Sequence, residues 1–358
     1  MKALIALLPG DGIGPEVTAQ AARVLAEVAR LHGHDFELRE ALVGGVAIDR
    51  TGVPLPAETI ALCRDADAVL LGAVGGPRWG PAEPVRPEQG LLALRRTLGV
   101  FANLRPAAMH PRLMGASPLK PAVLRGVDVL VVRELTGGIY FGEKRREPDW
   151  AEDLCAYSAD EIARVVRVAA TLAKSRKGRL TSVDKANVLE TSRLWREVAA
   201  RVVHEDFPGV QLDHQLVDSC ALRLLQKPSE YDVIVTENLF GDILTDLAAV
   251  LGGSIGMLPS ASLGLGGPGL YEPVHGSAPD IAGKGVANPY GAIGSVALLL
   301  RHSLRLEPEA REVEAAIAAA LEAGALPPDV ATGGERPCST SEAADAVLRA
   351  LALRKETR

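Results

Sequence analysis

The sequence has few cysteines and no closely spaced pair of them. Cys63, Cys155, Cys220 and Cys338 are far apart in a chain of 358 residues, and no CxxC motif occurs. Scattered single thiols are more typical of a reducing cytoplasm than of a disulfide framework or a zinc site. We therefore expect a cytoplasmic protein.

The sequence also lacks an excess of positive charge. It contains 39 Lys and Arg against 45 Asp and Glu, a net charge of −6. A nucleic-acid-binding protein needs a clustered basic face. The only dense basic cluster, residues 144–146, is balanced by the neighbouring Glu143, Glu147 and Asp149. We interpret this cluster as a solvated turn and expect no nucleic-acid partner.

No segment of the sequence is expected to enter a membrane. The opening apolar run MKALIALL ends at residues 9–11 without a small-residue cleavage site, so we interpret it as a strand. Residues 247–271 carry no charge and are long enough to span a bilayer, but many Gly, Ser and Pro residues interrupt them. Such interruptions are typical of buried loops and turns.

Strand-like and helix-like patterns alternate along the chain, and its length favours two lobes. The predicted strands cover residues 3–8, 67–72, 127–132, 180–183 and 232–235, and predicted helices include 190–205 and 240–251. Ser158 and Glu161 form a capping box before a further helix. Residues 137–142 resemble a β-arm, which we expect to pack on a partner subunit. Together these patterns predict an α/β protein with a largely parallel sheet.

The stretch ALLPGDGIGPEV, residues 6–17, resembles a phosphate-binding loop. A dinucleotide fingerprint needs the spacing G-x-G-x-x-G and a carboxylate about twenty residues further on. The spacing here is one residue short, and Asp35 and Glu37 do not close a clear second strand. We therefore favour a tight strand-to-helix turn, with Pro15 at the first helical position, over a phosphate cradle.

Two carboxylates stand four residues apart in ENLFGDILTD, residues 237–246. Asp242 and Asp246 would project from one face of a helix. They could simply favour the helix dipole. Alternatively, they could bind a divalent hard cation such as Mg²⁺ or Mn²⁺, which prefers oxygen ligands.

Three arginines end apolar runs: Arg95, Arg105 and Arg133. Each of them alone could make an ordinary surface salt bridge. Arginine also binds carboxylates in a bidentate manner. Three of them beside a metal site would form a pocket for a substrate with more than one carboxylate.

Three other residues are candidates for proton transfer or metal binding. Lys185 directly follows a predicted strand and could carry a proton or be merely solvated. Tyr140, on the suspected arm, could donate a proton or simply pack. Asp218 ends the strand-like segment QLDHQLVD and is a third candidate carboxylate.

The loop EPVHGSAPDIAG, residues 272–283, presents backbone groups, an imidazole and a carboxylate. Such a loop suits an adenosine, because Asp280 could accept both ribose hydroxyls while His275 stacks on the adenine. As a spacing pattern alone, this signal is weak.

Eight stretches, taken in order, resemble one family over nearly the whole chain: the β-decarboxylating dehydrogenases of the isocitrate/isopropylmalate dehydrogenase family. They are GDGIGPEV (10–17), AVGGPRW (73–79), LLALR (91–95), FANLRP (101–106), RELTGGIYFG (133–142), DKANVLETS (184–192), ENLFGDILTD (237–246) and EPVHGSAPDIAGKGVANP (272–289). The resemblance implies a two-lobed α/β fold with a shared twisted sheet, which is not a Rossmann fold.

The resemblance also implies a domain plan and an assembly. Residues 1–101 and 254–358 would form a first domain with the cofactor loop. Residues 102–253 would form a second domain with the metal site, the dimer contacts and a β-arm at about 134–157. The active sites of a homodimer would then lie between the lobes and be shared between subunits.

The resemblance assigns a role to each candidate residue. Tyr140 would be the proton donor, and Lys185 of the neighbouring subunit would handle the hydroxyl proton. The implied substrate-binding residues are Arg95, Arg105, Arg133, Asp218 and Leu91, and the implied metal ligands are Asp242, Asp246 and, from the other subunit, Asp218. The implied cofactor-binding residues are Gly75, Gly76, Glu88, His275, Gly276, Ser277, Ala278, Asp280, Ile281 and Asn288, with Ile13 lining the nicotinamide end.

Family members differ in the group that they accept at C3 of the substrate. The leucine-rich segment 90–94 before Arg95 suits an apolar branch, because a carboxylate there would lose its solvation. We therefore expect oxidation of 3-isopropylmalate to 4-methyl-2-oxopentanoate via 2-isopropyl-3-oxosuccinate, a step of leucine biosynthesis. Asp280 would repel a 2′-phosphate and so favours NAD over NADP.

Two other functions stay open at this stage. One is the oxidation of D-malate, tartrate or homoisocitrate by the same chemistry. The other is a non-catalytic regulatory paralogue, which should have lost at least one of the residues that catalyse the reaction or bind the metal. Tyr140, Lys185, Asp218, Asp242 and Asp246 are all present, which disfavours this alternative.

Overall fold

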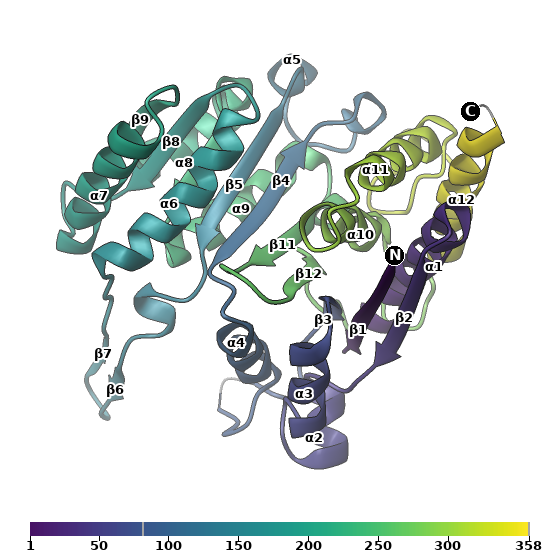
Figure 1. The fold of residues 1–358 in the computed structure, drawn as a ribbon, viewed down its shortest axis with the longest axis horizontal. Helices are drawn as coiled ribbons and strands as arrows, with labels where there is room; N and C mark the ends of the chain where they lie inside the picture. The colour runs from purple at the N-terminus through teal and green to yellow at the C-terminus, as the bar shows by residue number, and fades with distance from the viewer. Residues whose placement is uncertain (81, 357–358) are drawn as a thin grey trace. The chain divides into compact units, whose positions relative to one another are not determined.

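A computed structural model of the chain describes residues 1–80 and 82–356. The chain divides into two compact units (Figure 1). Unit 1 comprises Met1–Val100 and Gly253–Arg358, so both halves of the chain contribute to it, and unit 2 comprises Phe101–Gly252. Each unit contains strands of a β-sheet and the helices that cover them, which confirms the predicted α/β class.

The strands of unit 1 follow the order β2-β1-β3-β12-β11. They are β1 (Lys2–Gly10), β2 (Asp35–Glu40), β3 (Ala68–Ala73), β11 (Pro259–Leu263) and β12 (Gly269–Pro273). β1 pairs in parallel with β2 and β3, and β12 pairs in parallel with β3, whereas β11 is antiparallel to β12. Every residue of β3 is buried, as expected for a parallel strand that is covered on both faces. This order differs from the 3-2-1-4-5-6 order of a Rossmann fold.

Strand β2 was not predicted from the sequence. We expected no clear strand at Asp35 and Glu37, yet both residues lie in β2. Only Phe36 and Leu38 are apolar in this strand, and β2 ends the strand order of its unit. A strand at such an edge buries few side chains, so its hydrophobic pattern is weak.

Unit 1 contains a group of packed helices and a separate helix pair. They are α1 (Gly14–His32), α2 (Gly45–Thr51), α3 (Ala57–Asp65), α4 (Pro87–Leu98), α10 (Tyr290–His302), α11 (Glu307–Glu322) and α12 (Thr340–Glu356). α1, α10, α11 and α12 pack against one another, and α3 contacts α4 (Figure 1). In α1 the buried positions include Val17, Ala21, Val24 and Val28, the spacing of a helix with one apolar face.

His302, in the last turn of α10, makes the stability of unit 1 depend on pH. Burial lowers the pKa of His302 to about 4, and the neighbouring Arg301 and Arg305 add to this shift. The unfolded chain takes up this proton near pH 6.5, whereas the folded chain does so only near pH 4. Stability is therefore lost as the pH falls through this window.

Exchanging His302 for glutamine should weaken this acid sensitivity. Between pH 7 and pH 5, the free energy of unfolding of the wild type should fall by about 2 kcal/mol more than that of His302→Gln. Urea titrations of both proteins at the two pH values measure the difference. Equal decreases would show that the imidazole titrates normally in the folded protein.

The strands of unit 2 follow the order β4-β5-β10-β8-β9. They are β4 (Ala102–Ala108), β5 (Asp128–Glu134), β8 (Arg179–Asp184), β9 (Gln211–Leu216) and β10 (Val233–Thr236). β4 is antiparallel to β5, and the other neighbours pair in parallel. The candidate site lies where β5 and β10 end and the following segments begin.

The helices of unit 2 cover this second set of strands. They are α5 (Pro121–Leu124), α6 (Ala159–Lys174), α7 (Glu190–Asp206), α8 (Val217–Gln226) and α9 (Asn238–Ala248). The capping box predicted before α6 is present, with Ser158 and Glu161 bonded to each other's backbone amides. α6 packs on α7, and α8 contacts α9.

The arm of unit 2 starts later than predicted. Residues 137–142 were expected to be part of it, but Gly138–Tyr140 form a 3-10 turn. Gly138 has a φ of +70°, and a side chain there would collide with the hydroxyl group of Tyr157. The arm itself pairs β6 (Lys144–Arg146) with β7 (Ala151–Asp153), and it extends away from the rest of unit 2 in Figure 1.

No helix within residues 1–80 and 82–356 combines the length and the apolar character that a membrane span requires.

Candidate active site

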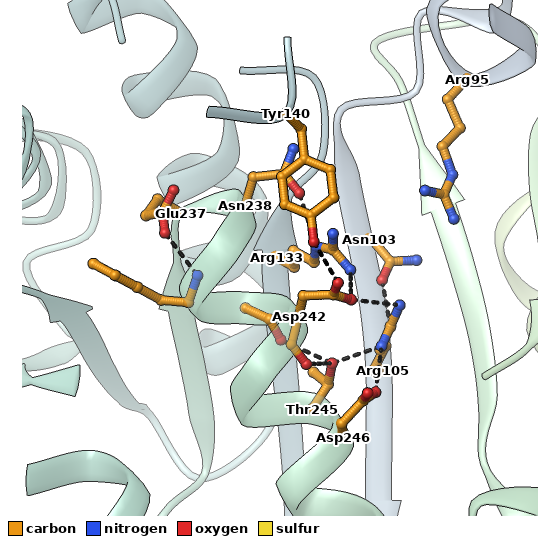
Figure 2. Close-up of polar contacts among 12 residues, drawn as sticks. Arg95, Asn103, Arg105, Arg133, Tyr140, Glu237, Asn238, Asp242, Thr245 and Asp246 are labelled. Carbon is orange, nitrogen blue, oxygen red and sulfur yellow. Dashed lines mark hydrogen bonds and ion pairs between the residues drawn. The ribbon is translucent and has the colours of Figure 1, made fainter. Parts of the chain in front are cut away.

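The candidate site of unit 2 is built on the first turns of α9. Glu237 caps this helix by accepting a hydrogen bond of 2.6 Å from the Phe240 amide. The helix then presents Asp242 and Asp246, one turn apart, toward Arg105 (Figure 2). The predicted helix is therefore confirmed, and both carboxylates lie on one face of it.

The antiparallel pairing of β4 and β5 places the arginines opposite this helix. Asn103 lies directly opposite Arg133, and Arg105 is two residues beyond Asn103. Side chains at these positions project from the same face of a sheet. Both arginines therefore point toward the carboxylates of α9 (Figure 2).

Arg133 is held on two sides. Its Nη1 binds the carboxylate of Asp242, and its Nε donates to Asn238 Oδ1 at 2.9 Å. The Asn238 amide in turn donates to the Gly137 carbonyl at 3.1 Å. Arg133 and Asn238 are 2% and 1% exposed, so the guanidinium is fixed in a buried network.

Arg105 contacts both acidic residues more loosely. Its Nε donates to Asn103 Oδ1 at 2.8 Å and its Nη1 to Thr245 Oγ1 at 2.6 Å. Each carboxylate, of Asp242 and of Asp246, lies 3.8 Å from a terminal nitrogen of this guanidinium. Arg105 is thus oriented by neutral partners and directs its charge to the space between the two acids.

Tyr140 completes the cluster from the 3-10 turn after β5. Its hydroxyl donates to Asp242 Oδ2 at 2.6 Å, and its ring lies 5.3 Å from the Arg133 guanidinium carbon. Burial and the hydrogen bond to Asp242 raise the pKa of Tyr140. Burial alone would also raise the pKa of Asp242, but Arg133, Tyr140 and Arg105 outweigh it and keep that pKa below its ordinary value.

Asp246 differs from Asp242 in its surroundings. Its side chain is 66% exposed, and it forms a long ion pair of 3.8 Å with Arg105. Partial burial and repulsion by Asp242 raise its pKa. Two neighbouring hard oxygen donors that repel each other fit a divalent cation.

These two acids do not form a complete metal site within one chain. In the described part of the chain, no three His, Cys, Asp or Glu side chains are grouped so that they could hold a metal. A cation at Asp242 and Asp246 would need further ligands from water, substrate or a second subunit.

Lys185 and Asp218 form a pair of their own. Lys185 follows β8 as predicted, and its Nζ donates to Asp218 Oδ1 at 2.5 Å. The hydrogen bond from Lys185 lowers the pKa of Asp218. Asp218 was predicted at the end of a strand, but β9 ends at Leu216 and Asp218 lies in the first turn of α8. An acidic residue is favourable at that helix end.

α4 of unit 1 carries three predicted site residues on one face. Glu88, Leu91 and Arg95 stand at positions i, i+3 and i+7 of this helix. Arg95 is 8% exposed and donates to Glu272 Oε1 of β12 at 2.7 Å, while its Nε has no partner among the described residues. Leu91 is half-buried and Glu88 is exposed.

The predicted cofactor loop also belongs to unit 1. His275 is 8% exposed, and its Nε2 is buried without a hydrogen-bond partner in the described structure. Burial lowers the pKa of His275, so its ring is neutral at pH 7. Asp280 is exposed, whereas Ser277 and Asn288 are buried. A neutral ring with an unused polar atom and a free-standing carboxylate fit the adenosine half of a dinucleotide.

The opening glycine motif forms the predicted strand-to-helix turn and lies against this loop. The Ile13 amide donates to the Ser277 carbonyl at 2.8 Å. Gly12 has a φ of +58°, and a Cβ atom there would lie 1.9 Å from the same carbonyl oxygen. No larger residue fits between the turn and the loop.

Asp11 of the same turn fastens the other predicted cofactor segment. Its carboxylate accepts hydrogen bonds of 2.7–2.8 Å from the amides of Gly45, Val46 and Gly75. A Cβ atom on Gly75, which has a φ of +114°, would lie 3.3 Å from Glu88 Oε1. Gly75 and Glu88 of α4 are therefore neighbours, and Gly76 follows Gly75 in the same loop.

Several residues of these networks were not identified from the sequence. They are Asp11, Asn103, Asn238, Thr245 and Glu272. Asp11, Asn103, Asn238 and Thr245 stand inside the family-like stretches, one to four residues from a predicted site residue, and this proximity was the available signal. Glu272 begins the last stretch, but nothing local indicates its pairing with Arg95, 177 positions away in the sequence.

Two arginines and a tyrosine facing paired carboxylates characterise an enzyme site for small acidic molecules. Comparison with known proteins agrees with this class. Residues 4–347 match the model of the isocitrate/isopropylmalate dehydrogenase family, and the chain belongs to this family.

The similar proteins share most of their length with this chain. It is 58% identical to a 3-isopropylmalate dehydrogenase of Anaeromyxobacter dehalogenans, over 98% of this chain and 100% of the relative. It is 56% identical to a 3-isopropylmalate dehydrogenase of Rhodopirellula baltica, over 98% and 100%. Among solved structures, an isocitrate dehydrogenase of Methylococcus capsulatus superimposes with a TM-score of 0.86 at 33% identity, over 98% and 99% of the two chains.

Proposed function

We propose that this chain catalyses the NAD-dependent oxidative decarboxylation of 3-isopropylmalate to 4-methyl-2-oxopentanoate, a step of leucine biosynthesis. The observation that carries the proposal is the helix face with Asp242 and Asp246 opposite Arg105, Arg133 and Tyr140. The proposal is also supported by relatives, because the chain is more than 50% identical to 3-isopropylmalate dehydrogenases.

Substrate binding follows from charge and from the apolar face of α4. Arg105 and Arg133 would bind one carboxylate of the malate unit, and Arg95 would bind the other. In the structure, Arg133 binds the carboxylate of Asp242 and Arg95 binds that of Glu272. The substrate carboxylates would bind the same guanidinium groups. Leu91 would contact the isopropyl branch, and a carboxylate at that position would be poorly solvated.

The cofactors would be NAD and a divalent cation, Mg²⁺ or Mn²⁺. Asp242 and Asp246 would hold the cation, together with Asp218 of the partner subunit. When bound, the cation supplies a Lewis acid beside the reacting oxygens, and NAD accepts the hydride. The exposed carboxylate of Asp280 would accept the ribose hydroxyls and disfavour NADP.

The side chains of this protein would move the protons. Lys185 of the partner subunit, as a neutral amine, would take the proton of the substrate hydroxyl as the hydride leaves C2. Loss of CO₂ then leaves an electron pair at C3, and Tyr140 would deliver a proton to that carbon. The raised pKa of Tyr140 keeps its proton in place until that step. Oxidation of the C2 hydroxyl to a ketone thus removes one hydride, which goes to NAD, and one proton, which goes to Lys185.

A homodimer would bring Lys185 and Asp218 to the second site. Unit 2, which we propose as the dimerisation domain, exposes large apolar side chains that include Leu222 of α8 at 57% and Ile243 of α9 at 56%. Trp150, beside the arm, is 49% exposed. Large apolar residues left exposed on contacting helices are typical of a subunit interface. We expect the enzyme to act in the cytoplasm.

Cofactor dependence tests the proposed chemistry. Purified protein with NAD and Mn²⁺ should form NADH when 3-isopropylmalate is added, and EDTA should abolish the reaction until excess Mn²⁺ restores it. NADP at the same concentration should give far lower rates. Full activity after exhaustive chelation would contradict a metal role for Asp242 and Asp246.

A further inference from the structure

Glu16 links the first helix to the far end of the predicted cofactor loop. It lies in the first turn of α1, and its carboxylate accepts hydrogen bonds from the backbone amides of Gly283 and, at 3.1 Å, Gly285. These partners lie 267 and 269 positions away in the sequence. Both glycines have positive φ values, +75° and +65°.

The loop carries Asp280 and lies outside the helices and strands of unit 1. On the side after Asp280, its backbone is held by Glu16 and by Thr340, whose amide donates to the Gly285 carbonyl at 2.9 Å and whose hydroxyl donates to the Ala287 carbonyl at 2.7 Å. Glu16 is the charged member of this set. Hydrogen bonds that involve an ionised group are stronger than neutral ones.

We propose that Glu16 is a positioning residue for NAD. By binding both glycine amides, it fixes the turn just after Asp280 and so holds the Asp280 carboxylate in place for the ribose. This inference rests on the proposed function, in which residues 275–288 bind the cofactor. Glu16 does not touch the reacting atoms, so it should affect NAD affinity and leave the chemical step unchanged.

A simpler role for Glu16 would be to stabilise the N-terminus of α1, where negative charge is favourable. Glu16→Gln and Glu16→Ala would both lose that interaction with the helix N-terminus, since both lose the charge. The two variants differ at the loop, because the glutamine amide oxygen can still accept a hydrogen bond from a glycine amide. Their difference therefore isolates the loop contact from the helix effect.

The test is NAD binding and turnover by the wild type and three variants. Glu16→Ala should raise the Kd for NAD about tenfold, the equivalent of one charge-assisted hydrogen bond. It should keep kcat at saturating NAD, and the KM for the hydroxy acid, within about twofold. Glu16→Gln should lie between the wild type and Glu16→Ala. Glu27→Ala, a control on the same helix whose side chain binds Arg30, should bind NAD like the wild type.

The outcomes separate the two proposals. Equal NAD affinity of the wild type and Glu16→Ala would overturn the positioning role, as would identical affinities of Glu16→Gln and Glu16→Ala. A wild-type protein that does not bind NAD would overturn the proposed function instead. Thermal unfolding of each variant shows whether a weakened NAD affinity results from the lost contact with the loop or from a loss of folded protein.

Discussion

Replacing Lys185 with alanine should lower kcat by about a thousandfold while the Kd for NAD stays within about twofold. Lys185 is proposed to remove the hydroxyl proton at the partner's site, and alanine has no group that can do so. The side chain is held by Asp218, and the backbone amide by Ser192 at 3.0 Å. These contacts position the side-chain nitrogen of Lys185 rather than the cofactor, which is why NAD affinity should be preserved.

A control separates the chemistry from the loss of a charge. Lys185→Arg keeps a positive charge that can pair with Asp218, but arginine does not release a proton at ordinary pH. It should therefore be nearly as inactive as Lys185→Ala. Turnover by Lys185→Arg near the wild-type rate would show that only the ion pair with Asp218 matters. A large loss of NAD affinity in Lys185→Ala would also contradict the assigned role.

Replacing Asp246 with asparagine should lower kcat/KM at fixed Mn²⁺ by about a thousandfold, because it removes a proposed metal ligand. The folded protein should keep its stability, since the Asp246 side chain is 66% exposed and its ion pair with Arg105 is long. Titration of activity with Mn²⁺ measures the effect, and the concentration for half-maximal activity should rise steeply. An unchanged Mn²⁺ requirement would exclude Asp246 as a ligand.

Asp242 provides the matched comparison. Asp242→Asn should also lose activity, but it would leave the buried Arg133 without its ionic partner and should therefore destabilise the protein. Asp246→Asn isolates the metal effect because it leaves that pair intact. A comparison of urea unfolding for the two variants checks that the loss in Asp246→Asn is not a loss of folded protein.

Residues that share one local element were well predicted from the sequence. The positions of Asp242 and Asp246 follow from helical spacing, and that of Lys185 follows from the end of a buried strand. The apolar stripe of α1 likewise follows from a local period. Such features depend on a few neighbouring residues, so a single sequence contains the information.

Contacts between distant segments were not predicted. Asn238 orients Arg133 from another element, and Glu16 reaches amides of a loop near the other end of the chain. These contacts depend on the path of the backbone, which local periodicity does not describe. The 3-10 turn at Gly138 is a further example, because Tyr157 from a distant segment leaves no room for a side chain there.

The glycine motif at residues 10–14 shows how a local pattern can indicate the right ligand by a different route. Its spacing suggested a phosphate cradle, but the structure shows a tight turn whose glycines allow close contact with the Ser277 carbonyl. The Ile13 amide of the motif donates to the Ser277 carbonyl of the predicted cofactor loop, and the Glu16 carboxylate of α1 accepts hydrogen bonds from the loop amides of Gly283 and Gly285. In the proposed NAD site, this turn would therefore hold the cofactor loop in place, and it would not bind the phosphates itself.

The most direct test of this account is a comparison of kcat/KM for purified protein with NAD and Mn²⁺ on five hydroxy acids: 3-isopropylmalate, D-malate, tartrate, isocitrate and homoisocitrate. The apolar face at Leu91 predicts the highest value for 3-isopropylmalate. D-malate should be slower but measurable, since an apolar pocket rejects a smaller analogue by only about 1–3 kcal/mol per methylene. A higher kcat/KM for D-malate, or for a substrate with a carboxylate on its C3 branch, would contradict the proposed function.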